Sequence, residues 1–186
     1  MNPLFAAAAE IQDVCRANRR GFCFIGGLAV LRWGEPRLTR DVDLTILSAY
    51  GSEAPVVDEL LDRFGSRIDD ARAFALRNRV VLLRAQNDVP VDVALGALDF
   101  ESRAVQRASP WDVGEVSLMT CGAEDLIVHK VFAGRDRDWL DVEGIVARQG
   151  EALDRDRVLH ELNPLLELKR SPGDIERLRA VLDVTG

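Results

Sequence analysis

The stretch FIGGLAVLRWGEPRLTRDVDL, residues 24–44, decides the fold of this chain. Two adjacent glycines, Gly26 and Gly27, stand between a short apolar run and the segment LAVLRW, whose apolar pattern predicts a helix. A strand-to-helix turn without side chains lets a phosphate group reach the backbone N–H groups at the start of the helix. The glycine pair therefore predicts a phosphate-binding turn.

The same stretch ends in two acids, Asp41 and Asp43, within a segment that alternates polar and apolar residues as a strand does. Because side chains alternate between the two faces of a strand, both carboxylates project together while Val42 and Leu44 enter the core. Two carboxylates on one surface repel each other unless a cation lies between them. Magnesium prefers one or two carboxylates together with phosphate oxygens, so the acids predict a site for a metal-bound nucleotide.

A third acid, Asp92, lies in PVDVALG, residues 90–96, a second segment with the alternation of a strand. From a neighbouring strand its carboxylate can join those of Asp41 and Asp43. Three acids allow two metal ions, of which one activates an attacking hydroxyl and the other binds the leaving phosphates. We expect all three aspartates to be catalytic and to bind two Mg²⁺ ions, with Mn²⁺ as the alternative metal.

The order of the remaining elements predicts a protein of the α/β class. Apolar periodicity predicts helices over residues 4–18, 28–33, 55–64 and 100–107, and strands over 22–25, 41–47, 74–84, 90–96 and 116–120. After Gly122 the chain is a series of helix-like segments. We expect an α/β domain over residues 1–120, with a mixed sheet and flanking helices, and a C-terminal helical lobe over residues 121–186.

The composition restricts the compartment and the partners. The chain has 186 residues and a formal net charge of −7 at pH 7, and no stretch is long and apolar enough to predict a membrane span. An acidic chain binds phosphate backbones weakly unless it has a local basic patch, and arginines do cluster, for example Arg37 and Arg40. Three cysteines without a CxxC pair argue against a disulfide framework. We expect a cytoplasmic protein without a membrane partner.

These motifs resemble the nucleotidyltransferase superfamily that includes polymerase beta, in which a glycine followed by a glycine or serine precedes an aspartate-x-acid pair and a later third acid. The segments GGLAV, RLTRDVDL and HKVFAGRDRDWLDV are similar, more closely, to the abortive-infection nucleotidyltransferase toxins of bacterial toxin–antitoxin systems. The resemblance covers residues 20–145 and implies a nucleotidyltransferase-type sheet. One departure from the superfamily is Gly27, which stands where many members have a serine.

The resemblance also implies a role for each matching residue. Asp41 and Asp43 would bind the metal, and Asp92 would activate the acceptor hydroxyl. Arg37 and Thr39 would position a phosphate or the base. The implied nucleotide-binding residues are Gly26, Gly27, Arg37, Thr39, Lys130 and Asp138.

Lys130 has both a functional and a purely structural interpretation. The resemblance implies that it contacts the triphosphate of the nucleotide. If residues 126–141 formed one helix, Lys130, Arg137 and Asp141 would lie on one stripe with Asp138 at its edge. Gly134, however, favours a break. In the structural interpretation, Lys130 only forms an ion pair with Glu124 or Asp138 on a helix surface.

The function implied by the resemblance is the Mg²⁺-dependent transfer of a nucleoside monophosphate from an NTP to an acceptor hydroxyl. As a toxin, the protein would act on RNA, at the 3′ end of tRNA, or on a protein side chain, and it would have a cognate antitoxin. Two alternatives stay open. One is an enzyme that modifies small molecules, as aminoglycoside nucleotidyltransferases do, which the acidic net charge favours. The other is a non-catalytic binding module or antitoxin with the same fold.

Overall fold

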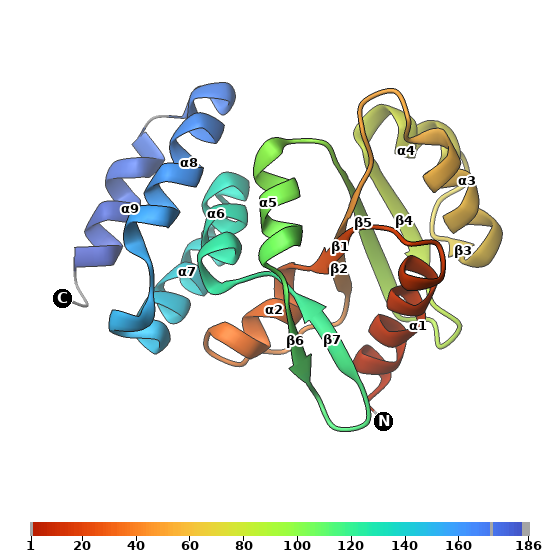
Figure 1. Cartoon of the computed structure of the whole chain (residues 1–186), viewed down its shortest axis with the longest axis horizontal. Helices are drawn as coiled ribbons and strands as arrows, with labels where there is room; N and C mark the ends of the chain where they lie inside the picture. The colour runs from red at the N-terminus through yellow and green to blue at the C-terminus, as the bar shows by residue number, and fades with distance from the viewer. Residues whose placement is uncertain (1, 172, 184–186) are drawn as a thin grey trace. The chain divides into compact units, whose positions relative to one another are not determined.

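The computed structural model describes residues 2–171 and 173–183 (Figure 1). The chain divides into two compact units. The first unit consists of Met1–Leu28 and Leu38–Cys121, and the second of Ala29–Arg37 and Gly122–Gly186. The predicted domain boundary between residues 120 and 121 stays a prediction. No helix in the described part of the chain combines the length and the apolar composition that a bilayer crossing requires.

A mixed sheet forms the centre of the first unit, and the predicted α/β class is confirmed. In the described residues its strands are β1 (Phe22–Phe24), β2 (Val42–Leu47), β3 (Gly65–Ser66), β4 (Val80–Arg84), β5 (Pro90–Gly96), β6 (Ser109–Asp112) and β7 (Ser117–Thr120). Their spatial order is β3-β4-β5-β2-β1-β7-β6. The pairs β2–β5 and β1–β7 are parallel, and the other neighbours are antiparallel.

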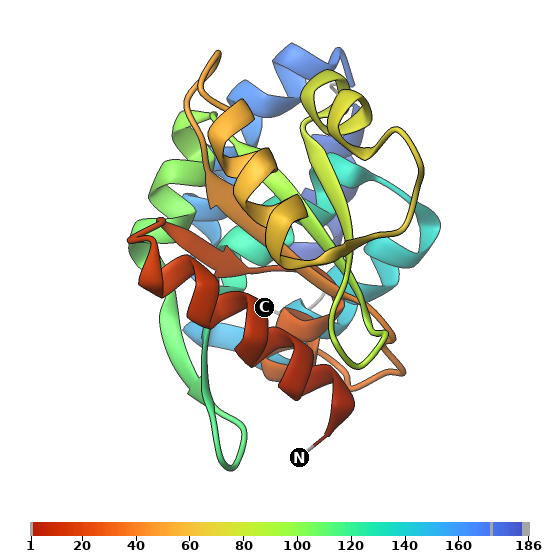
Figure 2. The same cartoon turned by 90° about the vertical axis from the view of Figure 1, so that its right-hand side faces the viewer.

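Helices cover both faces of this sheet (Figure 2). The helices of the first unit are α1 (Pro3–Ala17), α3 (Ala54–Arg63), α4 (Ala71–Asn78) and α5 (Asp99–Arg107), and α2 (Gly26–Trp33) begins directly after β1. Figures 1 and 2 show α1 and α3 on one face and α5 on the other. The core between these layers includes Val42, Leu44 and Ile46 of β2, which are all at most 1% exposed. Their burial confirms that the apolar residues of this strand point inward.

Two parts of the sheet region differ from the expectation. Residues 74–78, predicted as part of a strand, belong to α4, which ends where Arg79 adopts a left-handed conformation with φ of 55°. A short apolar run fits a helix as well as a strand, and here the helix forms and the strand starts only at Val80. The sequence also gave no indication of β3 or β6, because such short strands carry too little alternation to be recognised.

The second unit is helical, as predicted. After the last turns of α2 it contains α6 (Ala123–Ala133), α7 (Asp136–Gln149), a short 3₁₀ segment (Gly150–Ala152), α8 (Arg155–Lys169) and α9 (Gly173–Asp183). The segment 126–141 is not one helix, because α6 ends at Gly134, whose φ of 72° is a left-handed cap. This break turns the chain so that α7 contributes its first turns to the same buried cluster as the end of α6.

Candidate active site

Three carboxylates share one face of the sheet in the first unit. β2 and β5 pair in parallel with Asp43 directly opposite Asp92, so these two side chains point to the same side at neighbouring positions about 4.8 Å apart along the sheet. Asp41 lies immediately before β2 and has the same parity as Asp43. Asp41 is exposed, whereas Asp43 and Asp92 are half-buried. The strand register therefore sets Asp43 beside Asp92, and Asp41 lies two residues before Asp43.

The face that carries these acids is the one that α5 covers farther along the strands. Thr45 and Leu47 follow Asp43 on the same side of β2. Thr45 and Glu101 of α5 both lie near Gly96. Leu47 and Val105 of α5 both lie near Gly21. The acids thus lie beyond one end of α5, on the side of the sheet opposite α1 and α3.

The glycine turn lies against Asp43. Gly26 has φ of 60°, a left-handed conformation that favours glycine, and a Cβ atom added there would overlap the carboxylate of Asp43. The N–H group of buried Gly27 points at Asp43 Oδ2 over 3.4 Å. Because the turn and the strand approach so closely, both the conformation and the space at position 26 require glycine.

Asp92 forms an ion pair with Arg67, a residue that the sequence analysis missed. Arg67 Nη2 contacts Asp92 Oδ1, and both side chains are only partly exposed. Burial raises the pKa of Asp92, the Arg67 charge lowers it and the Asp41 charge raises it, which leaves the pKa of this carboxyl above its ordinary value. The influence of Asp41 shows that the acids interact electrostatically.

The donor chemistry of this face suits a hard divalent cation. Mg²⁺ is bound in proteins by one or two carboxylates plus substrate oxygens, and Asp41, Asp43 and Asp92 supply such carboxylates from adjacent backbone positions. Within the described residues, however, no group of three or more His, Cys, Asp or Glu side chains forms a metal-ligating arrangement. The backbone positions therefore suit a metal site, while in this structure the carboxylate of Asp43 faces the N–H of Gly27 and that of Asp92 is paired with Arg67.

A second charged cluster lies in the second unit, around Lys130. This lysine is 6% exposed and forms ion pairs with Asp138 Oδ1 at 2.9 Å and with Asp141 Oδ2 at 2.8 Å. Both acids come from the start of α7, and both are at most 5% exposed. Of the two partners that the structural interpretation offered, Lys130 pairs with Asp138, but this ion pair is buried rather than on a helix surface.

Two arginines complete this cluster. Arg37 binds both carboxylate oxygens of Asp141, at 2.6 and 2.8 Å, and Arg135 Nε donates to Asp138 Oδ2 at 2.6 Å. Burial raises the pKa of each aspartate, but the hydrogen bonds and charges of the arginines and Lys130 outweigh it, so the pKa of both carboxyls is below its ordinary value. Asp138 and Asp141 are therefore held in their ionised form.

The predicted nucleotide-binding residues thus fall into both units. Gly26 and Gly27 belong to the first unit with the acids, and so does half-buried Thr39, in the segment between α2 and β2. Arg37, Lys130 and Asp138 belong to the second unit, where Asp141 connects Arg37 to Lys130. No short-range signal pointed to Arg67, because its pairing with Asp92 depends on β3, a strand of two residues.

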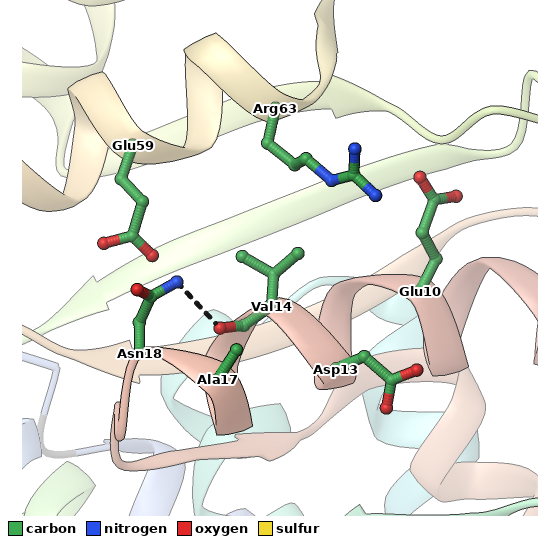
Figure 3. Close-up of a pocket in the computed structure, with 7 residues that line it drawn as sticks. All are labelled: Glu10, Asp13, Val14, Ala17, Asn18, Glu59 and Arg63. Atoms are coloured by element: carbon green, nitrogen blue, oxygen red, sulfur yellow. Dashed lines mark hydrogen bonds between the residues drawn. The ribbon is translucent and has the colours of Figure 1, made fainter.

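A hollow of about 480 Å³ lies elsewhere in the first unit, between α1 and α3 (Figure 3). It is lined by Glu10, Asp13, Val14, Ala17, Asn18, Glu59 and Arg63. Figure 3 shows Arg63 extending toward Glu10, and Glu59 is paired with Arg20 at 2.7 Å. This hollow is on the face of the sheet opposite the three acids, and none of the predicted site residues lines it.

Comparison with solved structures supports the fold. An antigenic nucleotidyltransferase-like protein from Paracoccidioides brasiliensis superimposes with a TM-score of 0.52 and 14% identity, covering 96% of this chain and 91% of that one. The antibiotic-resistance factor ANT(2'')-Ia gives a TM-score of 0.51 and 15% identity, covering 92% and 96%. At such low identity the likeness shows that this chain shares their fold. Comparison with curated proteins gives no significant match.

Family comparison covers most of the chain. Residues 12–179 match the family described as nucleotidyl transferase AbiEii toxin of type IV toxin–antitoxin systems. The matched range includes the glycine turn, all three acids of the sheet and the Lys130 cluster. The chain therefore belongs to the AbiEii family of nucleotidyltransferase toxins and is a nucleotidyltransferase enzyme.

Proposed function

We propose that this enzyme transfers a nucleoside monophosphate from an NTP to an acceptor hydroxyl at the face formed by Asp41, Asp43 and Asp92. The observation that carries the proposal is the parallel register of β2 and β5, which sets Asp43 opposite Asp92 beside the glycine turn. In this reaction the acceptor oxygen bonds to the α-phosphorus, and pyrophosphate leaves with the electrons of the broken P–O bond.

The three acids would hold the divalent metal and prepare the acceptor. Asp41 and Asp43 would bind Mg²⁺, or Mn²⁺ in its place, and Asp92 would complete a site for two ions. When bound, these ions neutralise the triphosphate and lower the pKa of the acceptor hydroxyl. Asp92 would also accept the proton of that hydroxyl, since it is the acid that the resemblance places at the acceptor.

The glycine turn would bind the phosphates of the NTP. The backbone N–H of Gly27 points at a carboxylate oxygen of Asp43 over a long 3.4 Å, a contact that a phosphate oxygen can replace. If Asp43 held a metal ion instead, the N–H group of Gly27 would be free to bind the nucleotide. Gly26 and Gly27 therefore act through their backbone, and the absent serine hydroxyl at position 27 is not required.

The resemblance to the nucleotidyltransferase toxins also assigns nucleotide contacts to Lys130 and its neighbours in the second unit. Lys130, Arg37 and Arg135 carry three positive charges against the two negative charges of Asp138 and Asp141, so these five groups have a net charge of +1. A net positive charge fixed by buried acids suits a triphosphate. In this proposal Asp138 orients Lys130, Arg37 contacts a phosphate, and Thr39 in the first unit positions the phosphate or the base.

The acceptor we propose is RNA, at the 3′ end of tRNA, with a protein side chain as the second choice. The support is the family, whose description as toxins of type IV toxin–antitoxin systems also implies an antitoxin partner for this chain. A small cationic acceptor is the rival candidate. It is favoured by the net charge of −7 and by a fold shared with the antibiotic-resistance factor ANT(2'')-Ia.

The test is to incubate the purified protein with each labelled NTP, Mg²⁺, total tRNA and cell protein. We expect label on tRNA with at least one NTP, and no label after removal of Mg²⁺ with a chelator or in the Asp41→Ala variant. Labelling that survives Asp41→Ala, or the absence of any labelled acceptor, would contradict the proposed reaction.

Expression in cells separates the two acceptors. A toxin that modifies tRNA arrests growth, and the arrest should disappear in the Asp41→Ala variant. Resistance to a cationic antibiotic without growth arrest would instead assign the small-molecule function. If the wild-type protein shows neither effect and fails to bind an NTP with Mg²⁺ in calorimetry, the non-catalytic alternative is supported.

A further inference from the structure

Arg67 reaches Asp92 along a single row of the sheet. The backbone N–H of Arg67 donates to Leu82 O at 3.1 Å, which extends the pairing of β3 with β4 by one residue. Leu82 lies opposite Asp92, and Asp92 lies opposite Asp43. These residues therefore form one row across neighbouring strands, with Arg67 at the edge and the acids at its other end.

Only a long side chain can make this contact. Two strand spacings, about 9.6 Å, separate the backbone of Arg67 from that of Asp92. The guanidinium nevertheless forms an ion pair with Asp92 Oδ1, and the Arg67 side chain remains 24% exposed. The backbone is fixed near this point, because Ser66 Oγ accepts the N–H of Ile68 at 3.1 Å. The charged end is thus held by Asp92, while the chain that carries it is anchored.

The hydrogen bonding of Arg67 is incomplete. Its Nε atom is buried and has no hydrogen-bond partner within the described part of the chain. A buried donor without a partner destabilises the folded state, so the pair with Asp92 is not an optimised structural ion pair. An arginine that only stabilised the fold would be expected to use its fork of donors fully, as Arg72 does with both oxygens of Asp58.

We propose that Arg67 is a positioning residue that binds Asp92 in place of a divalent cation and must release it when the metal-bound nucleotide arrives. The inference rests on the proposed function, since it takes Asp92 as a metal ligand. The guanidinium offsets part of the repulsion among the three acids on this face of the sheet. It also competes with the metal, so nucleotide-free protein binds a divalent ion more weakly than three carboxylates alone would.

The test is a titration of nucleotide-free protein with Mn²⁺, in which the electron paramagnetic resonance signal reports the unbound ion. Arg67→Met keeps much of the length of the side chain and removes its charge. We expect Mn²⁺ to bind about tenfold more tightly to this variant, because a positive charge next to the ion is lost. Arg67→Lys should stay within about threefold of the wild type, since the charge is kept.

The matched control is Arg72→Met, which removes the same charge from an exposed arginine of the first unit. Arg72 is also paired with an aspartate, Asp58, at 2.6 Å, but through α3 and α4 rather than on the face of the acids. Its Mn²⁺ affinity should match that of the wild type. An equal gain in Arg72→Met and Arg67→Met would show a general effect of net charge and overturn the inference.

A double-mutant cycle separates this inference from the proposed function. In an Asp92→Asn background, Arg67→Met should no longer change Mn²⁺ affinity, because the carboxylate for which the two cations compete is gone. A gain that persists in this background, or unchanged affinity in folded Arg67→Met, overturns the role of Arg67. If Arg67→Met does not fold, Arg67→Gln provides the same comparison. If wild-type protein binds no Mn²⁺ at all, the metal site itself fails.

Discussion

The two charged clusters of this protein are built from the same residue types but in opposite ways. On the sheet of the first unit, three negative charges share one partly exposed face, those of Asp41, Asp43 and Asp92. Arg67 forms an ion pair with one of these acids, Asp92. In the second unit, two buried aspartates are each neutralised by Lys130 and an arginine.

The pKa values show the same contrast. The pKa of Asp92 is raised, first by burial and then by Asp41, whereas hydrogen bonds and cations hold the pKa of Asp138 and Asp141 below the ordinary value. The sheet acids repel one another, so their face is suited to bind an external cation. The acids around Lys130 are paired within the protein, so that cluster stabilises the structure and presents a fixed charge. Four predictions test this difference.

The largest expected effect is the loss of transfer activity in Asp43→Asn. We expect the rate to fall about 1,000-fold or more, because a held metal contributes several kcal/mol to the transition state. Stability should not fall, since removing one acid relieves repulsion. The measurements are nucleotide transfer and urea unfolding. The control is Asp88→Asn, at an exposed turn, which should leave transfer activity and stability unchanged. A fully active Asp43→Asn enzyme would show that this face of the sheet is not catalytic.

The second largest effect should be a loss of stability when the buried cluster around Lys130 is disrupted. Lys130→Met leaves two buried carboxylates without their shared partner, so we expect the free energy of unfolding to fall by about 3 kcal/mol. Urea unfolding monitored by circular dichroism measures it. Lys169→Met is the matched control, because its side chain is 32% exposed and its loss should cost less than about 1 kcal/mol. Similar costs for both variants would mean that the buried cluster is not structural.

A third prediction compares two glycines with positive φ. Gly26→Ala combines backbone strain with overlap between the new methyl group and the carboxylate of Asp43, so both stability and activity should fall. Gly51 has φ of 79° and no neighbour within 4 Å of an added Cβ atom, so Gly51→Ala should cost about 1 kcal/mol of strain and leave activity intact. If Gly51→Ala impaired transfer as strongly as Gly26→Ala, contact with Asp43 would not be the cause.

The smallest expected effect is the pH dependence of unfolding. A carboxyl whose pKa is lowered by folding stabilises the protein above the unfolded pKa, near 4, and this stability is lost as the pH falls through the folded pKa. Asp138 and Asp141 are such groups, so Asp141→Asn should flatten the acid side of the stability profile. Asp92, whose pKa is raised, has the opposite sign. A profile below pH 4 that is identical in Asp141→Asn and wild type would contradict this assignment.

Local pattern was sufficient to predict the faces of the strands but not their partners. Alternation in residues 41–47 and 90–96 placed Asp41, Asp43 and Asp92 on strand faces, because parity is a local property. That Asp43 lies directly opposite Asp92 depends on β2 pairing with β5 across two intervening helices and two other strands. Such long-range pairing has no local signal.

The sequence predicted the pairing of Lys130 with Asp138 and the break at Gly134, but not the other partners of the charged residues. The pair Lys130–Asp141 depends on how α6 packs against α7, and the pair Arg37–Asp141 depends on where the segment after α2 meets α7. Arg37 and Asp141 are 104 positions apart in the chain. Arg67 was missed for the same reason, since its row in the sheet depends on a strand too short to be recognised.

The measurement that tests the central claim most directly is anomalous X-ray scattering from crystals grown with Mn²⁺ and a non-hydrolysable NTP. We expect at least one manganese peak within bonding distance of the carboxylates of Asp41 and Asp43, about 2.0 to 2.3 Å, with the triphosphate next to Gly26 and Gly27. Manganese and nucleotide bound elsewhere, with these carboxylates still turned away from the ion, would contradict the account.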